Sequence, residues 1–265
     1  MEIGIIGMGT VGRAVRRLLG PHAGIVEYDV KGGASYPSEQ LAGCEFAVVC
    51  VDTPPAADGS CDTSRVEEAV AALPVDRVLI RSTVAPGTTD RLVAATGKHC
   101  CFSPEYIGES PYVDGGWGGR EEDVPFVVLG GEPATTAWFC DRLVGMLGPS
   151  RTFFQCSAVE AEIVKYMENA FLATKVAFVN EFFEVCGALG ADWHRVREGW
   201  LLDPRVGRSH SAVFPADRGF DGKCLPKDVR AIVAAAAAAG YDARLLAEVL
   251  TSNERHRGGG GQSEA

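Results

Sequence analysis

The first half of the chain alternates between short apolar segments and segments with helical spacing, and this alternation constrains the fold more than any other feature. The expected strands are residues 2–7, 24–29, 44–51, 77–82, 99–103 and 125–131. Helices are expected at Thr10–Leu19, which Gly20 closes, and at Thr63–Leu73. Short apolar strands that alternate with helices predict an α/β fold, a doubly wound parallel sheet covered on both faces.

The second half has a different texture, which indicates a helical region. Proline is absent from Ala158 to Leu189 and apolar residues recur at helical spacing, so we expect one long, largely buried helix. Its apolar positions are Ile163, Val164, Met167, Phe171, Leu172, Val176, Phe178 and Val179. Further helices are expected at 193–200, 227–239 and 243–256, with Gly240 between the last two. The predicted domains are residues 1–155 (α/β), 156–257 (all-helical) and a disordered tail, 258–265.

Composition argues against several classes of function. The 265 residues carry a net charge of −10 without a long basic run, which argues against nucleic acid and membrane surfaces as partners. We see no targeting segment and no apolar run near the roughly 20 residues that span a bilayer. Nine cysteines without a CxxC pair argue against disulfides and a zinc or other metal site. We therefore expect a cytoplasmic protein with reduced thiols.

A glycine-rich turn, "GMGTVG", joins the first expected strand to the first expected helix. Gly7 and Gly9 allow a tight turn and close approach of a pyrophosphate, and Gly12 lets helix and strand pack closely. Asp29 ends the second strand, where a carboxylate can accept both ribose hydroxyls. The pattern predicts a Rossmann-type domain that binds NAD rather than NADP. The alternative is a glycine-rich turn in another α/β fold, with Asp29 as a loop acid.

Polar residues follow the later strands. Thr53 and Thr83 come directly after the third and fourth strands, whose carboxyl ends line the ligand crevice of a doubly wound sheet. Glu105 and Glu109 follow the fifth strand and are four residues apart, so a helical turn would place both on one face. The alternatives are turn residues with satisfied hydroxyls and solvated surface acids.

The long helix carries Lys165 and Asn169 one turn apart on one face. A lysine in a mostly apolar helix is either a rim residue with a buried stem or a functional cation. Spacing alone leaves both interpretations open.

A second glycine-rich segment, "GFDGKCLPKD", places Cys224 between two lysines and four residues before Asp228. The cysteine is a buried apolar residue, a metal ligand or a nucleophile. Lys223 and Lys227 would favour a thiolate in the last case.

Together these segments resemble the UDP-glucose/GDP-mannose dehydrogenases along nearly the whole chain. In order they are "GIIGMGTVG", "CVDTPP", "RSTVAPGTT", "SPEYIGE", "EIVKYMENAFLATKVAFVNEF", "DPRVG" and "GFDGKCLPKD". The lysine–asparagine helix also occurs in the wider group of β-hydroxyacid dehydrogenases, whereas the cysteine segment is typical of the nucleotide-sugar enzymes. Taken by itself, the long helix from Ala158 would expose a broad apolar stripe, so we expect a homodimer formed through the helical domains. The possible substrates are a nucleotide sugar, a smaller sugar or nucleoside, or another primary alcohol.

The resemblance also implies a four-electron oxidation of a primary alcohol to a carboxylate with two NAD⁺. Cys224 would add to the aldehyde as a thiohemiacetal, which is oxidised to a thioester and hydrolysed. Lys165 and Asn169 would stabilise the developing oxyanion. Asp228 would assist proton movement or orient water with Thr83, and Glu105 would act as general base.

The same resemblance assigns the remaining contacts. Arg205 would reach the substrate of the partner across the dimer, and Glu109 would lie beside the nicotinamide. The residues expected to bind the cofactor are Gly7, Met8, Gly9, Thr10, Val11, Gly12, Asp29, Thr53, Pro54, Thr83, Glu109 and Lys227. Those expected to bind the substrate are Glu105, Lys165, Asn169, Arg205, Gly222 and Cys224.

The chain also departs from the family pattern. Family members carry a third domain that grips the nucleotide, and this chain ends where that domain would begin. The Arg205–Cys224 segment is slightly longer than usual, Ser110 follows Glu109 where glycine is common, and "YVDGGWGGR" is unfamiliar. These departures leave the substrate open. They also leave two other hypotheses: a two-electron dehydrogenase of the β-hydroxyacid type, and a non-catalytic NAD-binding protein.

Overall fold

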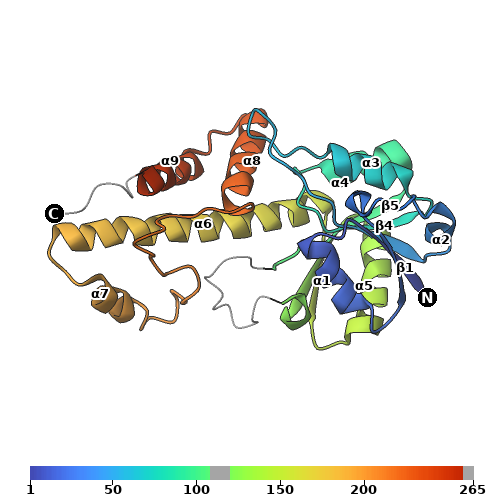
Figure 1. The fold of residues 1–265 in the computed structure, drawn as a ribbon, viewed down its shortest axis with the longest axis horizontal. Helices are drawn as coiled ribbons and strands as arrows, with labels where there is room; N and C mark the ends of the chain where they lie inside the picture. The colour runs from blue at the N-terminus through green and yellow to red at the C-terminus, as the bar shows by residue number, and fades with distance from the viewer. Residues whose placement is uncertain (108–119, 259–265) are drawn as a thin grey trace. The chain divides into compact units, whose positions relative to one another are not determined.

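The computed structural model describes residues 1–107 and 120–258, which Figure 1 traces from blue to red. These residues form two compact units. Unit 1 comprises residues 1–57, 61–107 and 120–165, and unit 2 comprises residues 58–60 and 166–258. Glu109, Ser110 and residues 259–265 lie outside the described residues.

Unit 1 is built on a seven-stranded sheet in the order β2-β1-β3-β4-β5-β6-β7. The strands are β1 (Glu2–Ile6), β2 (Gly24–Tyr28), β3 (Phe46–Val49), β4 (Arg77–Ile80), β5 (His99–Phe102), β6 (Phe126–Gly130) and β7 (Thr152–Cys156). β1 pairs with β2 on one side and with β3 on the other, so the winding reverses between β1 and β3. In such sheets the ligand crevice lies outside the carboxyl ends of the strands at this point.

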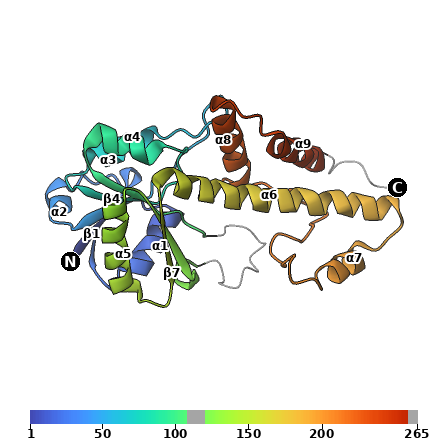
Figure 2. The ribbon, with the colours of Figure 1, turned by 180° about the vertical axis from the view of Figure 1, so that it is seen from behind.

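Helices cover both faces of the sheet. On one face lie α1 (Thr10–Leu19) and α5 (Pro133–Leu147), labelled together in Figures 1 and 2, and their apolar residues share a core with β1 and β3. The other face is covered by α2 (Ser38–Ala42), α3 (Ser64–Ala72) and α4 (Thr88–Thr96). The two separate cores confirm the predicted doubly wound α/β fold.

Two features of the sheet differ from the sequence-based expectation. β5 and β6 pair antiparallel, although all strands were expected to be parallel. A parallel partner needs a crossover, usually a helix, and the described part of the connection holds only the short helical turn η2 (Glu121–Asp123). β7 was not predicted; it is a short strand at the edge of the sheet, and most of its residues are exposed although Phe153 and Phe154 are apolar.

Four helices account for most of the rest. They are α6 (Ala158–Ala188), which begins in unit 1 and continues into unit 2, α7 (Trp193–Trp200), α8 (Leu225–Ala238) and α9 (Arg244–Gly258). The predicted helices lie within two residues of these bounds, and Gly240 has the expected positive φ of 83°. Within the described ranges, no helix combines the length and apolar character required to cross a bilayer.

The apolar pattern of the long helix α6 predicted that it is largely buried, but part of its surface is exposed. Val176 and Val179 are fully buried, and the core of unit 2 packs on that side of the helix. Met167 and Phe171, by contrast, are 72% and 62% exposed. The expectation was wrong because apolar residues surround much of α6, whereas the described part of the chain covers only part of its surface.

Candidate active site

The first glycine-rich turn has the geometry that its sequence predicts. Gly7 has a positive φ of 92°, and a Cβ on it would lie 2.8 Å from the backbone of Cys50. A Cβ on Gly12 would lie 1.9 Å from the carbonyl oxygen of Gly7, so helix α1 and the turn are in contact through backbone. Beyond its chain neighbours, no atom of the residues that the structure describes lies within 4 Å of a Cβ on Gly9. The turn therefore presents open backbone at the start of α1, as a bound pyrophosphate requires.

Asp29 lies where β2 ends, beside this turn. Its carboxylate accepts hydrogen bonds from the N–H of Met8 at 2.7 Å and of Lys31 at 2.8 Å. The N–H groups of Lys31 and Met8 hold the pKa of Asp29 below its ordinary value, so the carboxylate is charged at neutral pH. A charged acid here can accept ribose hydroxyls and repels a 2′-phosphate.

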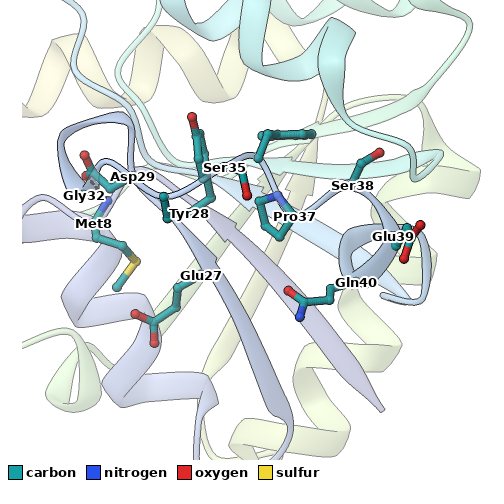
Figure 3. A pocket seen from close by; sticks show the side chains of 12 residues that line it. Met8, Glu27, Tyr28, Asp29, Gly32, Ser35, Pro37, Ser38, Glu39 and Gln40 are labelled. Carbon is teal, nitrogen blue, oxygen red and sulfur yellow. Dashed lines mark hydrogen bonds between the residues drawn. The ribbon is translucent and has the colours of Figure 1, made fainter.

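A cleft of 770 Å³ opens beside Asp29. Figure 3 shows Asp29 and Met8 at one end of this cleft and Ser38 and Glu39 at the other. Of the residues expected to bind a cofactor, Met8 and Asp29 line it. The open glycine turn, the anionic Asp29 and the cleft together fit a dinucleotide with an unphosphorylated ribose. Thr10 and Val11 lie in the first turn of α1.

The turns after β3 and β4 are in contact, and the Thr53 hydroxyl is satisfied within the protein. The buried hydroxyl of Thr53 donates a hydrogen bond to the carbonyl oxygen of Thr83 at 2.7 Å, and the Cys61 thiol lies 3.5 Å from the same oxygen. The Thr53 side chain thus supports the Thr83 turn, while Pro54 follows Thr53 on the half-buried rim. The contribution of Cys61 was not foreseen from the sequence.

Glu105 and Lys165 form a buried ion pair in unit 1. The Lys165 ammonium donates to the Glu105 carbonyl oxygen at 2.6 Å and to its carboxylate at 3.0 Å. Burial alone would raise the pKa of Glu105, but the Lys165 charge, the Ile107 N–H and Arg81 together hold it below its ordinary value. Glu105 is therefore not a solvated surface acid, and Lys165 is not a rim residue. Residues 103–107 are not helical, and Glu109 lies outside the described residues.

Glu162 is a buried acid that the sequence interpretation missed. It is fully buried on α6, one turn before Lys165, and accepts hydrogen bonds from Gly87 N (2.5 Å), Thr89 N (2.8 Å) and the Thr89 hydroxyl (2.7 Å). Burial raises the pKa of Glu162 above its ordinary value despite these donors. Glu162 thereby ties α6 to the loop that carries Thr83. An acid inside an apolar helix was the available signal.

Unit 2 contains a second buried polar group. The Asn169 amide donates to one carboxylate oxygen of Asp228 at 2.5 Å, and the Lys227 ammonium donates to the other at 2.5 Å. Asp228 is 1% exposed. Lys227, expected to contact the cofactor, thus neutralises Asp228.

Cys224 immediately precedes α8, where its carbonyl oxygen accepts the N–H of Asp228. It is exposed, whereas the other cysteines are buried or half-buried, so it is not a core residue. Gly222, two residues earlier, has a positive φ of 86°. Among the described residues, no three His, Cys, Asp or Glu side chains gather into a metal-binding group. An exposed thiol at a helix N-terminus is a chemically accessible nucleophile.

Arg205 lies in the turn after α7. Its side chain is 88% exposed and pairs with Asp203 at 2.5 Å. Lys175 on α6 holds the next part of this turn through the carbonyl oxygens of Val206 (3.0 Å) and Gly207 (2.8 Å). The substrate contact expected for Arg205 therefore stays a prediction that needs a partner subunit.

Comparison with known proteins relates this geometry to a family. Residues 159–255 match the central domain of the UDP-glucose/GDP-mannose dehydrogenase family. The UDP-glucose 6-dehydrogenase of Haloferax volcanii is 31% identical over 239 residues, and that of Pseudomonas aeruginosa is 32% identical over 237 residues. The matches cover 82% and 83% of this chain but 54% and 51% of those enzymes, so the chain spans about half the length of these relatives.

A solved structure agrees with these relatives. The UDP-glucose dehydrogenase of Pyrobaculum islandicum superposes with a TM-score of 0.81 at 28% identity, covering 96% of this chain and 68% of that enzyme. The GDP-mannose dehydrogenase of Pseudomonas aeruginosa shares the fold at 22% identity and a TM-score of 0.67. These matches confirm the family resemblance that the sequence segments indicate.

Proposed function

We propose that this chain, whose residues 159–255 match the central domain of the UDP-glucose/GDP-mannose dehydrogenase family, is an NAD-dependent dehydrogenase that oxidises a primary alcohol of a sugar or nucleotide sugar to a carboxylate. The proposal rests on one observation above all. Cys224 is exposed at the start of α8, one turn before a buried Asp228 that Asn169 and Lys227 hold in place. The relatives from Haloferax volcanii and Pseudomonas aeruginosa are UDP-glucose 6-dehydrogenases, which supports this activity.

The thiol is needed because the second oxidation is harder than the first. An aldehyde carbon has no suitable hydride to lose until a nucleophile has added to it. The Cys224 thiolate adds to the carbonyl carbon and forms a thiohemiacetal, whose oxidation leaves a thioester. Water then cleaves the thioester, releasing the carboxylate and regenerating the thiol. NAD⁺ held at the glycine turn and Asp29 would supply the oxidising power, one hydride acceptor for each of the two oxidations.

The other residues of the proposed site have roles that follow from their charge, their hydrogen-bonding groups or their size. Lys165 is buried and cationic beside Glu105, and with the Asn169 amide it would stabilise the oxyanion of each tetrahedral intermediate. The low pKa of Glu105 keeps it ionised at neutral pH, so it can accept a proton from the water that attacks the thioester. Asp228 and Thr83 would orient that water. Gly222 would allow close approach of the substrate.

We further propose that the cofactor lies against the glycine turn and Asp29, with the chain acting in the cytoplasm as a homodimer. The exposed apolar residues of α6 support the dimer, since a stripe of this kind is usually covered in an assembly. Arg205 would then reach the substrate bound by the partner subunit. Light scattering at micromolar concentration should give the mass of a dimer, and a monodisperse monomer would contradict this part of the proposal.

The decisive experiment measures stoichiometry. Purified protein is screened for NADH formation with nucleotide sugars, nucleosides and simple sugars, and the product of any active substrate is quantified. Two NADH per carboxylate are expected. One NADH per aldehyde or ketone would support the two-electron reaction instead, and absence of turnover with measurable NAD binding would support a non-catalytic protein.

The covalent step has its own test. Asp228→Asn or Glu105→Gln should slow hydrolysis more than oxidation, so a thioester should accumulate on the protein. Intact-protein mass spectrometry should detect an adduct that disappears when Cys224→Ala is added. An adduct that persists in the double variant would place the chemistry at another residue.

A further inference from the structure

Two asparagine side chains form hydrogen bonds with the backbone of Gly219 and Phe220, just before the segment that carries Cys224. Asn253 of α9 accepts the N–H of Phe220 at 2.7 Å and donates to the carbonyl oxygen of the same residue at 2.9 Å. A single side-chain amide thus satisfies both backbone groups of Phe220, as a neighbouring β-strand would. Asn253 is 6% exposed, so water competes little for these bonds.

Asn180 of α6 holds the two preceding residues. Its side-chain oxygen accepts the Gly219 N–H at 3.2 Å and the Arg218 guanidinium at 2.7 Å, while its amide donates to Val176 at 2.9 Å. Asn180 is 1% exposed and all its polar groups are paired. Buried amides persist only with such partners, so the position of residues 218–220 is linked to both helices.

The backbone shape at this point allows little alternative. Gly219 has a positive φ of 76°, and a Cβ on it would lie 2.4 Å from the Asn253 side-chain oxygen. The Phe220 ring is 2% exposed and packs in the core of unit 2 with Val229 and Val249. The Gly219 backbone, the Asn180 and Asn253 amides (the asparagine clamp) and the Phe220 ring therefore fix the start of the segment that carries Cys224.

The C-terminal end of this segment, at Asp228, is fixed as well. Asp228, four residues beyond Cys224, is held by Asn169. Between Phe220 and Cys224 the chain passes Gly222, which has a positive φ and, among the described residues, no atom within 4 Å of an added Cβ. Asp221 in this stretch accepts a hydrogen bond from Arg257 of α9 at 2.7 Å, so the position of the thiol depends on this contact and on the two ends of the segment.

We propose that Asn180 and Asn253 are positioning residues that place the Cys224 thiol at the N-terminus of α8, a role that rests on Cys224 as the proposed nucleophile. With the hydrogen bonds of Asn180 and Asn253 in place, the start of α8 is fixed, and the positive end of the helix dipole favours the thiolate. Without them, the segment and the first turn of α8 loosen, and the thiol leaves this environment.

The test uses the full chain with two substitutions at the same contact. Asn253→Ala removes the amide, and Gly219→Ala pushes the backbone against it. Thr251→Val serves as the control, because Thr251 lies two residues away on the exposed side of α9 and its hydroxyl bonds only within that helix. Thermal unfolding and circular dichroism first establish that each variant is folded.

The main readout is the rate at which iodoacetamide alkylates Cys224 at neutral pH, followed by peptide mass spectrometry. We expect Asn253→Ala and Gly219→Ala to lower this rate roughly 3- to 10-fold, because thiolate reactivity depends on the helix N-terminus. Carboxylate formation should fall about tenfold while interconversion of alcohol and supplied aldehyde is retained. Thr251→Val should match the unmodified protein in both assays.

Alkylation at the control rate in a folded Asn253→Ala variant would overturn the positioning role. An equal loss of both oxidation steps would also overturn it, because it would indicate general damage rather than a displaced thiol. The alkylation assay needs no substrate. A protein whose thiol responds to the clamp but which forms no NADH would therefore retain the positioning role while the proposed function fails.

Discussion

The two glycine-rich turns of this protein look alike in sequence but are shaped by different neighbours. Each precedes a helix, and each contains glycine with positive φ. Around Gly7 and Gly12 the close neighbours are backbone atoms of the turn and of Cys50. Around Gly219 the close neighbours are the side chains of Asn253 and Arg257, and within the described part of the chain nothing lies close to a Cβ on Gly222.

The difference teaches what each turn tolerates. The neighbours of the first turn are backbone atoms, which no substitution can remove. A side chain at Gly12 would therefore displace helix α1 from its strand. The closest neighbour of the second turn is the Asn253 side chain, which a substitution can remove. The shape of the second turn therefore depends on a residue that is distant in the sequence. The first turn suits a fixed dinucleotide site, and the second suits a thiol whose position depends on supporting groups.

The largest effect is expected at the thiol of the second turn. Cys224→Ser should bind NAD⁺ normally and lose carboxylate formation by roughly 10³-fold or more, because a hydroxyl does not replace the thiolate in the second oxidation. Cys224→Ala should still interconvert alcohol and supplied aldehyde slowly. Cys140→Ser, at a half-buried thiol on α5, is the control. Wild-type carboxylate formation by Cys224→Ala would show that the thiohemiacetal route is wrong.

The next largest effect is expected from alanine substitutions of glycine, which should change NAD binding in the first turn but not in the second. Gly12→Ala must displace Gly7 from its 1.9 Å overlap, costing about 1–3 kcal/mol of stability and weakening NAD binding at least tenfold. Gly222→Ala meets no neighbour, so its positive φ costs only about 1–2 kcal/mol, and NAD binding should be unchanged. Calorimetric binding and thermal unfolding measure both. Gly145→Ala in α5, with open space at its Cβ, is the helix control. Similar NAD affinities for all three variants would remove the distinction between the turns.

A smaller effect concerns cofactor choice at the first turn. The unmodified protein should bind NAD much more tightly than NADP, because the charged Asp29 repels a 2′-phosphate. Asp29→Ala should weaken NAD binding about tenfold, or about 1.4 kcal/mol, and narrow the preference. Titration calorimetry with both cofactors tests this. Equal affinities in the unmodified protein would refute the ribose assignment.

The smallest effect is a pH dependence of stability. The pKa of Asp29 is lowered in the folded state, so its contribution is present above its ordinary pKa of 3.8 and is lost as pH falls through the folded value. Asp29→Asn should therefore lower the unfolding temperature more at pH 7 than at pH 3. Glu39→Gln, at an exposed acid of α2, is the control. A constant difference between the two pH values would show that the charge on Asp29 does not stabilise the turn.

Much of the fold followed from local pattern. The bounds of α1 and α7 and the long α6 were predicted within a residue, because helical spacing and the glycines at helix ends are local signals. The first turn was equally predictable, since Gly7 and Gly12 are needed for contacts within the same short segment. Cys224, Lys165 and Asn169 were identified as candidates by residue type and spacing.

Tertiary structure alone decided which of these residues are paired, and with what. The Glu105–Lys165 bond spans 60 residues, the Glu162–Thr89 bond 73 and the Phe220–Asn253 bond 33. No local pattern specifies such pairs, and the antiparallel pairing of β6 and the asparagine contacts of residues 218–220 escaped prediction for the same reason. The sequence determined the order of elements and the chemical groups available. Burial and long-range hydrogen bonds determined which groups are held, charged and accessible, because their energies depend on neighbours that only the folded chain brings together.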